Sequence, residues 1–424
     1  MNARLENIVF HIDVNAAFLS WEAVYRLAHR GGKLDLRKIP SAVGGDIALR
    51  HGIILAKSIP AGRYGITTGE TIPEARRKCP DLVLVPPHYN LYEKCSAAFM
   101  EILREYSDVV EQYSIDEAFV DMRASCHLFG PPEETAAQIK DRIREELGFT
   151  VNVGISDNRL LAKMASDFRK PDRVHTLYPR EIETKMWPLP VSDLFFVGRV
   201  ATDKLRSMGI RTIGELAKAE PDWLKSTLKK QGELIRQFAN GMDCSPVLEK
   251  PVENKGYGNS TTTPFDVADA ETADRVLLAL SETVGSRLRA DRVQAGVISA
   301  GVRYTDMSYA SHQRKLHNPT NLTWEIYKTA RRLFRELWDG RPLRHLGVHT
   351  GGIDGTGFGR QLSVFDEIDY EKLSKVDRTV DAIRGRFGAD AVMRAAFSGT
   401  SFDHMSGGIS REKRSVDYDE VIVE

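Results

Sequence analysis

The chain has 424 residues, of which 42% are apolar and 28% are charged, a composition typical of folded globular proteins and not of disordered ones. It exceeds the size of one ordinary core, so we expect three or four compact units; no run approaches about 18 consecutive apolar residues, which excludes a membrane-spanning helix. The 59 basic and 59 acidic residues cancel, whereas nucleic-acid enzymes usually carry a basic excess, so any such function must depend on local charge.

The N-terminal part of the chain alternates β-prone runs with amphipathic helical stretches. Asn15 is placed as the N-cap of the first helix. The order strand–helix–strand–strand–helix–strand predicts a ferredoxin-like sheet built from split βαβ units. Strands are predicted at 8–12, 53–56, on both sides of a polar turn within 109–122, and at 149–155, and helices at 16–27, 92–106 and 133–147.

The sequence pattern changes after Pro171. Short helical pieces separated by glycines are predicted over 191–219, followed by a helical stretch to Met242 and a linker over 245–257. A second α/β unit is predicted over 260–350, a loose glycine-rich segment over 351–360 and a last helix over 370–387.

The cysteines indicate a reducing compartment. All four lie far apart with no C-x-x-C pair, which favours scattered free thiols over a zinc site or a disulfide framework. Residues 1–7 carry no apolar leader, so we expect a cytoplasmic protein. The cysteines are Cys79, Cys95, Cys126 and Cys244.

Three carboxylates occupy positions where a strand ends or a hairpin turns: Asp13, Asp116 and Glu117. An Asp-Glu pair in a turn is most often a solvated turn. Here, however, both acids interrupt an apolar, β-prone stretch, where they would be costly without a cation. Carboxylate oxygens suit Mg²⁺, and two such ions about 3.5–4 Å apart hold the attacking and leaving oxygens of a phosphoryl transfer.

Three segments resemble the motifs of Y-family DNA polymerases, in the DinB (DNA polymerase IV) branch of bacterial enzymes. Residues 10–18, FHIDVNAAF, resemble the first metal motif, and residues 113–121, YSIDEAFVD, resemble the second. Residues 154–171, GISDNRLLAKMASDFRKP, resemble the third motif. The three motifs come in the family's order, and the similarity extends over about residues 8 to 350.

The resemblance implies a multidomain α+β right-hand polymerase. It implies low-fidelity synthesis opposite damaged templates, without a proofreading exonuclease. The implied regions are a ferredoxin-like palm (1–30 and 80–172), fingers (31–79), a helical thumb (173–243), a linker (244–258), an α/β little finger (259–352) and a C-terminal tail (353–424).

Carried over by position, Asp13, Asp116 and Glu117 are the ligands of two Mg²⁺ ions, helped by the carbonyl of Val14. Phe18 matches the aromatic steric gate, which excludes ribonucleotides by a clash with the 2′-hydroxyl. Asn15 and Ala17 replace an expected acid and an expected aromatic residue.

The triphosphate of the incoming deoxynucleotide is expected to meet Lys163. The family's fingers usually add a Tyr and an Arg three residues apart, but this chain has Ile59 and Gly62 there. Arg63 or Lys57 is the candidate replacement.

Primer–template DNA is expected to contact the thumb and the little finger. Residues 194–214 resemble a helix-hairpin-helix whose glycine turn offers backbone N–H groups to phosphate, although its first glycine is missing. A plain helix–turn–helix packing unit and a solvated basic surface remain the alternatives. The candidate contacts are Gly198, Arg199, Gly209, the threonine-rich run 260–263, Arg287, Arg289, Arg303, Arg331 and Arg332.

A short peptide after the little finger resembles the pentapeptide by which bacterial polymerases bind the sliding clamp. It follows a glycine-rich tether and supplies a polar residue and three apolar anchors, although such a pattern is also compatible with a short strand. Its residues are Gln361, Leu362, Val364 and Phe365.

The main expectation is therefore an active, monomeric DNA polymerase acting at the nucleoid. Its alternatives are a UmuC-like subunit that works only with partners, and a catalytically impaired DNA-binding scaffold of a mutasome. The scaffold would require damaged metal positions, yet all three carboxylates are present.

Overall fold

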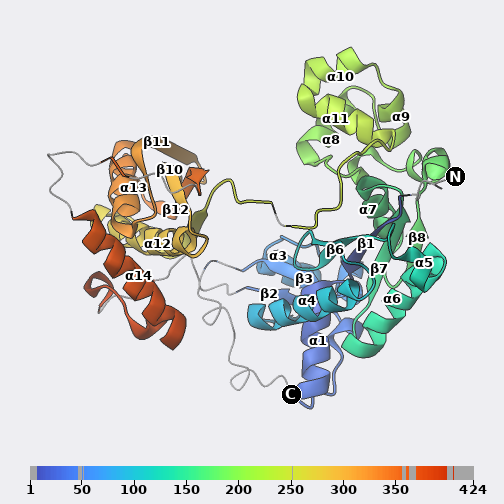
Figure 1. Cartoon of the computed structure of the whole chain (residues 1–424), viewed down its shortest axis with the longest axis horizontal. Coiled ribbons are helices and arrows are strands. Elements are labelled where there is room, and N and C mark those ends of the chain that lie inside the picture. The colour runs from blue at the N-terminus through green and yellow to red at the C-terminus, as the bar shows by residue number, and fades with distance from the viewer. Residues whose placement is uncertain are drawn as a thin grey trace. The chain divides into compact units, whose positions relative to one another are not determined.

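The computed structural model describes residues 7–45, 50, 52–250, 252–355, 360–361, 369–398 and 404. The chain forms two compact units, the first from Met1–Val43 and Ile54–Pro251 and the second from Gly44–Ile53 and Val252–Glu424 (Figure 1). The described residues include no helix long and apolar enough to cross a membrane.

A five-stranded sheet forms the centre of the first unit. β1 lies between β6 and β7 and is antiparallel to both, while β8 runs parallel to β7 at one edge. The order β5-β6-β1-β7 is that of a ferredoxin-like sheet, which confirms the prediction and adds β8. The strands are β1 (Val9–Val14), β5 (Val110–Gln112), β6 (Glu117–Asp121), β7 (Val151–Ser156) and β8 (Val174–Thr176).

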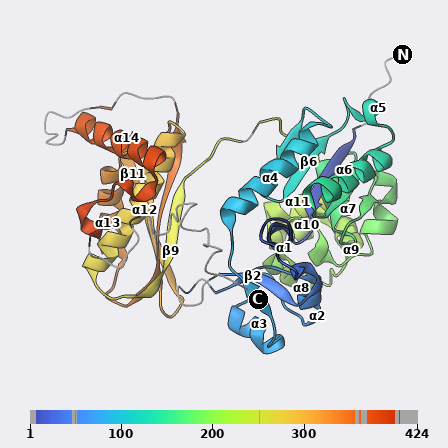
Figure 2. The same ribbon diagram turned by 90° about the horizontal axis from the view of Figure 1, so that it is seen from below.

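The two faces of this sheet are covered by different helices. α4 (Tyr89–Arg104) and α6 (Pro132–Leu147) pack on one face (Figure 2). α7 (Arg159–Asp167) packs on the other, where Ala162 meets Val9 and Phe119. Because successive strand residues point to opposite faces, β1 sends Phe10, Ile12 and Val14 into the first core and His11 and Asp13 toward α7.

Helix α1 (Ala17–His29) corrects one prediction. Its N-cap is Ala16, in the left-handed region with φ 48°, and not Asn15. The Asn15 side chain is instead buried: it donates to Asn152 Oδ1 at 3.2 Å and accepts from the Asp172 amide at 2.9 Å. An amide both donates and accepts, which suits this position better than the carboxylate expected from the family motif.

A small three-stranded sheet and two short helices follow α1. The strand order is β3-β2-β4, with β2 parallel to β4. The elements are β2 (Ser41–Gly44), β3 (Ile54–Lys57), β4 (Val83–Val85), α2 (Ile59–Arg63) and α3 (Ile72–Lys78).

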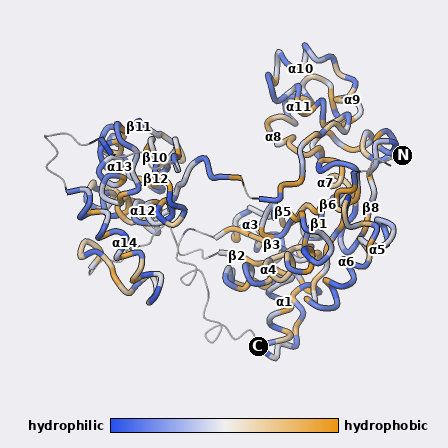
Figure 3. The backbone as a smooth tube through the Cα atoms, viewed as in Figure 1, coloured by the Kyte–Doolittle hydropathy of each residue, from blue (hydrophilic) through white to orange (hydrophobic). Residues whose placement is uncertain are grey.

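Four short helices complete the first unit around a second core, which includes their Leu205, Leu216, Leu224 and Ile235 and also buried residues of α7. Hydrophobic and hydrophilic segments alternate along their trace, as expected for amphipathic helices (Figure 3). The helices are α8 (Arg199–Ser207), α9 (Ile213–Lys218), α10 (Pro221–Leu228) and α11 (Lys230–Ala239).

The second unit contains a four-stranded antiparallel sheet of order β11-β10-β12-β9. Its core joins one face of the sheet to α12 (Ala270–Ala290) and α13 (Thr323–Leu337). The predicted loose segment begins too early, because residues 351–354 pair with β10 as the end of β12. The strands are β9 (Gly258–Val267), β10 (Gln294–Tyr304), β11 (Tyr309–Thr320) and β12 (Leu343–Asp354).

The predicted last helix is confirmed as α14 (Tyr370–Phe387), and buried ion pairs attach it to the second unit. Arg289 of α12 contacts Asp377 at 3.2 Å and Asp381 at 2.6 Å. Asp377 also accepts from the Thr323 amide at 2.8 Å and so caps the first turn of α13. The segment 369–398 is therefore part of the folded unit and not an independent tail.

Candidate active site

The ends of β1 and β6 bring two of the three predicted carboxylates together. Asp13 is directly opposite Glu117 in the β1–β6 register. Asp116 lies in the turn before β6, where its carbonyl accepts from the Val14 amide at 3.0 Å. One backbone hydrogen bond thus ties the first metal motif to the second.

A cavity of about 360 Å³ opens beside these carboxylates. Asp13, which is 8% exposed, and Asp116 line it, and so do residues of β3. The prediction that Asp13, Val14, Phe18 and Asp116 share one site is therefore consistent with their placement. The full lining is Asp13, Val14, Ala16, Ala17, Phe18, Leu55, Ala56, Lys57, Thr68 and Asp116.

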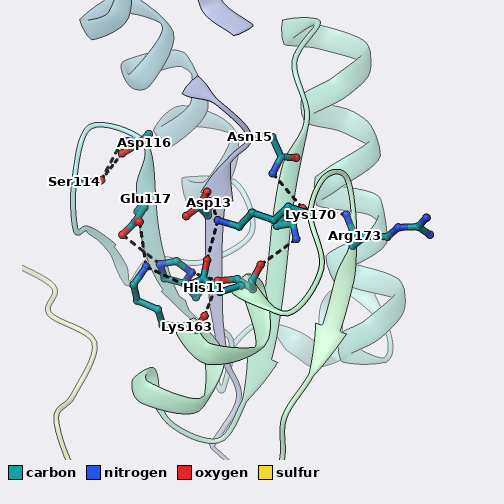
Figure 4. A network of polar contacts seen from close by, with 12 residues as sticks. His11, Asp13, Asn15, Ser114, Asp116, Glu117, Lys163, Lys170 and Arg173 are labelled. Carbon is teal, nitrogen blue, oxygen red and sulfur yellow. Dashed lines mark hydrogen bonds and ion pairs between the residues drawn. The ribbon is translucent and has the colours of Figure 1, made fainter. Parts of the chain in front are cut away.

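Two lysines neutralise the carboxylates. Lys170 Nζ lies 3.1 Å from Asp13 Oδ1, and Lys163 Nζ lies 3.0 Å from Glu117 Oε1 (Figure 4). Burial raises the pKa of the Asp13 carboxyl above its ordinary value, and the Lys170 ammonium opposes this rise. Burial acts in the same direction on Glu117, but the nearby His11 imidazole and the charge of Lys163 outweigh it and hold that pKa below its ordinary value.

The donor set of this site fits a divalent cation, although the described residues contain no preassembled group of three metal-ligating side chains. Asp116 Oδ1 accepts from the Ser114 hydroxyl at 2.6 Å, while Asp13 and Glu117 are held by the lysines. Three carboxylates and the backbone carbonyl of Val14 are hard oxygen donors, which Mg²⁺ prefers. The ammonium groups of Lys170 and Lys163 already place positive charge beside Asp13 and Glu117, as a bound cation would.

His11 lies beneath the carboxylates and was not singled out from the sequence. It is fully buried; its Nδ1 is 2.8 Å from Ser166 Oγ, and its Nε2 is 3.7 Å from Glu117 Oε2. Burial lowers the pKa of this imidazole despite the neighbouring carboxylate. A usable signal was its place two residues before Asp13 on one strand, which puts both side chains on the same face.

Gly154 allows α7 to reach the sheet and so positions Lys163. A Cβ at this residue would lie 1.9 Å from the Ala162 carbonyl oxygen and 2.5 Å from the Ser166 amide nitrogen. Both neighbours are backbone atoms of α7, so the helix would have to move.

We therefore expect Gly154→Ala to lower the thermal unfolding temperature and to reduce catalytic activity by more than tenfold, because overpacking costs about 1–3 kcal/mol and displaces Lys163. Differential scanning fluorimetry and a turnover assay measure the two effects. Gly385→Ala on α14, which has open space around the added Cβ and no left-handed backbone, tests whether position matters beyond the loss of a glycine. Equal activity of Gly154→Ala and wild type would contradict this role.

Phe18 forms a fixed aromatic wall of the cavity. Its ring stacks on Tyr92 with centroids 4.4 Å apart and planes 9° from parallel, and it also contacts Trp21 and Tyr89. Phe18 is half-buried, so one part of the ring faces the cavity. Ala17 beside it is buried and also lines the cavity, where the family motif has an aromatic residue.

The three cationic candidates for the nucleotide are placed differently. Lys163 is buried and paired with Glu117, while its ammonium also lies 5.6 Å from the Phe195 ring centroid. Arg63 is the exposed last residue of α2 and does not line the cavity. Lys57, at the end of β3, lines it.

The predicted hairpin of the helical region is present in altered form. Gly198 is the N-cap of α8 and Arg199 its first residue, while Gly209 follows its end with φ 81°. At the place of the missing first glycine, Phe196 has φ 70°, a left-handed conformation that favours glycine. The hairpin therefore keeps its turn geometry without its usual glycine.

The basic residues of the second unit fall into two groups. Several on the helices are neutralised: Arg331 contacts Asp274 at 2.9 Å, and Arg332 contacts Glu336 at 3.2 Å. Arg289, also expected among the DNA contacts, is enclosed between Asp377 and Asp381. Arg287 is exposed and donates to the Gly258 carbonyl at 3.2 Å.

The outer face of the second unit's sheet has a different character. On β10, Ser299 and Arg303 point away from the helices, because Ala300 and Val302 point into the core. Lys315 faces the same side, opposite Val297. Neither Arg303 nor Lys315 has an ion-pair partner in the described part of the chain. The other outward positions paired with β10 over 297–303 carry no carboxylate: they are Tyr309, Ser311, Gln313, His345, Gly347, His349 and Gly351.

The expected clamp-binding peptide falls almost wholly outside the described residues. Leu362, Val364 and Phe365 lie outside them. Gln361 is described; its backbone amide and carbonyl both bond to the Asn318 side chain, at 3.2 and 3.0 Å.

The chain matches known proteins along most of its length. The impB/mucB/samB family profile matches residues 12–167, its HHH motif residues 179–210 and its C-terminal domain residues 254–364. DNA polymerase IV of Clostridium acetobutylicum is 44% identical over 392 residues, which is 92% of this chain and 98% of that protein.

Two further relatives agree with this match. DNA polymerase IV 2 of Bacillus subtilis is 37% identical over 399 residues, covering 92% of this chain and 94% of that protein. A solved Y-family DNA polymerase chimera superposes with a TM-score of 0.69 at 23% identity, covering 82% of this chain and 99% of that chain. The latter likeness concerns the fold.

Proposed function

The chain belongs to the impB/mucB/samB family of Y-family DNA polymerases, and we propose that its cavity binds an incoming deoxynucleotide and joins it to a primer 3′ end. The chain is a DNA-directed DNA polymerase of the translesion kind, with the right-hand fold of that family. One observation carries the site assignment: Asp13, Asp116 and the wall formed by Phe18 line a single cavity, and Glu117 lies directly opposite Asp13 in the strand register.

The family implies divalent metal ions, and we propose two Mg²⁺ held by Asp13, Asp116, Glu117 and the Val14 carbonyl. When bound, such ions lower the pKa of the primer hydroxyl and neutralise the phosphate charge that develops in the reaction. The residues of the chain hold the donors in place: the strand register fixes Asp13 against Glu117, and the Val14–Asp116 hydrogen bond fixes the turn.

Lys163 and Lys170 are the cations beside these carboxylates. In the structure they neutralise Glu117 and Asp13. We propose that Lys163 turns toward the triphosphate once metal ions have taken over that neutralisation, since an ammonium group on a flexible stem can change partners. Phe18 excludes a ribose 2′-hydroxyl by contact.

The alternative functions are less favoured. A catalytically impaired scaffold has no need of three intact carboxylates beside a cavity. A UmuC-like subunit that acts only with partners is distinguished by experiment. The purified chain alone should extend a primer on undamaged and damaged templates, inserting the base that the template directs; failure without added proteins would favour the subunit.

DNA binding is proposed for the outer face of the second unit's sheet, together with the amide groups of the hairpin at Gly198 and Arg199. Phosphate contacts require cations that have not already been neutralised. Arg303 and Lys315 meet this condition, whereas Arg331 and Arg332 are paired with carboxylates.

The double substitution Arg303→Ala with Lys315→Ala should lower the slope of log affinity against log salt by about 2, because each phosphate contact contributes about 0.9. Fluorescence anisotropy of labelled primer–template DNA over a salt series measures the slope. Arg331→Ala with Arg332→Ala is the matched pair on α13 and should leave it nearly unchanged. If only the Arg331 and Arg332 variant lowered the slope, the DNA would bind the helical face of the second unit instead.

We also propose that residues 361–365 bind the sliding clamp, on the strength of their sequence alone. Deleting them should leave extension of naked primed DNA unchanged and remove its stimulation by the clamp, measured as product length with and without the loaded clamp. Stimulation that persists after the deletion would refute the docking. A monomer acting on chromosomal DNA in the cytoplasm completes the proposal.

A further inference from the structure

The last residue of β3, Lys57, places a cation in the cavity. Its neighbours Leu55 and Ala56 line the same cavity, together with Asp13 and Asp116. Lys57 is half-buried, and its side chain has neither a hydrogen bond nor an ion pair to any residue that the structure describes.

This lack of a partner separates Lys57 from the other two lysines of the site. Lys163 is paired with Glu117, and Lys170 is paired with Asp13 and with Asp167 at 2.8 Å. An ammonium group beside a cavity and without a counter-charge is available to pair with an anionic ligand group. Lys57 is such a cation: it lines the cavity and has no ion-pair partner in the described part of the chain.

The environment of Lys57 depends on the residue at position 62. Gly62 has no side chain, and a Cβ added there would lie 3.5 Å from Lys57 Cε. The lysine stem thus runs past the place where a larger side chain would begin. The neighbouring residue of α2, Ile59, is 55% exposed and has no charge. Ile59 and Gly62 thus leave α2 without the Tyr and Arg side chains expected at these two positions. The aliphatic part of the Lys57 side chain lies beside Gly62.

We propose that Lys57 binds the triphosphate of the incoming nucleotide, in the place of the polar groups that Ile59 and Gly62 do not provide. The inference rests on the proposed function, because the cavity must receive a deoxynucleoside triphosphate. It assigns the binding charge to β3 and not to Arg63, which is exposed at the end of α2 and outside the cavity lining.

The test is single-nucleotide insertion by the full-length chain on a primed template with Mg²⁺. Lys57→Met keeps the length of the side chain and removes its charge, so KM for the nucleotide should rise about 10- to 100-fold, the loss expected for a hydrogen bond to a charged group. The kcat should change less than about threefold, and the affinity for primer–template DNA should not change. Lys57→Arg should restore most of the lost nucleotide affinity.

Two comparisons separate binding from a structural effect. Lys38→Ala removes an exposed cation from the same part of the chain and should leave KM unchanged. The unfolding temperature of Lys57→Met should match that of wild type, since Lys57 makes no contact that folding requires. Arg63→Ala tests the alternative that Arg63 binds the triphosphate. A rise in KM for Arg63→Ala with none for Lys57→Met would overturn the proposal.

Failure of the inference and failure of the proposed function give different results. If wild type inserts nucleotides and Lys57→Met has an unchanged KM, the role of Lys57 is wrong and the polymerase function stands. A fall in kcat at constant KM would likewise overturn the binding role. If wild type inserts no nucleotide, the proposed function falls and the role of Lys57 falls with it.

Discussion

Asp116→Ala should reduce primer extension by at least about 10³-fold while leaving the affinity for primer–template DNA nearly unchanged. Metal ions in such sites supply several kcal/mol of transition-state stabilisation, and each 1.36 kcal/mol corresponds to a factor of about ten in rate. Asp116 is at the cavity wall, and among the described residues its carboxylate accepts a single hydrogen bond, from the Ser114 hydroxyl in the same turn. Its removal therefore deletes a proposed metal ligand and no described contact between distant parts of the chain.

Single-turnover extension and anisotropy with labelled DNA measure the two quantities. Asp108→Ala provides a matched control, because Asp108 is an exposed carboxylate just before β5, on the other strand of the same hairpin. Extension by Asp116→Ala near the wild-type rate would remove Asp116 from the metal site. A large loss with Asp108→Ala would instead indicate that the hairpin is sensitive to any change of charge.

Phe18→Ala should admit ribonucleotides, raising the efficiency of ribonucleotide insertion about 100-fold relative to deoxynucleotide insertion. The Phe18 ring is held by its stack on Tyr92 and cannot turn aside without losing that contact. A rigid wall discriminates by clash, so removing it relaxes selection without requiring a new attraction. The expected factor corresponds to about 2.7 kcal/mol of lost discrimination.

The measurement is the ratio of kcat/KM for dATP and ATP opposite a template thymine, in wild type and variant. Deoxynucleotide insertion in the same variant serves as the internal control, since it reports any general damage to the cavity. An unchanged ratio would show that another residue excludes the 2′-hydroxyl. If the efficiencies of both nucleotides fell together, the substitution would have damaged the cavity in general.

Local sequence patterns predicted the sheet that carries the carboxylates. The apolar run before Asp13 and the split β-prone segment around Asp116 and Glu117 each gave an element in the right place, because strand alternation and turn chemistry are local. The meeting of Asp13 with Glu117 followed from the predicted ferredoxin-like order, in which the first and third strands are neighbours.

Contacts between distant residues were not predictable in this way. Asn15 has the sequence context of an N-cap, yet its partners Asn152 and Asp172 come from segments far along the chain. The pairing of Lys163 and Lys170 with the carboxylates also depends on how α7 packs at Gly154. Long-range hydrogen bonds of this kind override a local preference.

The charge of the second unit shows the same limit. Its arginines look equivalent in the sequence, but Arg289 is enclosed by α14 and Arg331 by Asp274, whereas Arg303 faces outward on β10. Strand alternation fixes which side of the sheet Arg303 occupies, but the carboxylates that neutralise the helical arginines come from other elements. Counting basic residues therefore overestimated the surface available to DNA.

The dependence of single-nucleotide insertion on Mg²⁺ tests the central claim most directly. The purified full-length chain, with a primed undamaged template and one matched deoxynucleotide, should insert that nucleotide in Mg²⁺, lose activity on chelation and recover it when Mg²⁺ is restored. Asp13→Ala, Asp116→Ala and Glu117→Ala should each remain inactive at every Mg²⁺ concentration. Insertion that survives chelation, or variants that match wild type, would contradict a metal-dependent nucleotidyl-transfer site at these three carboxylates.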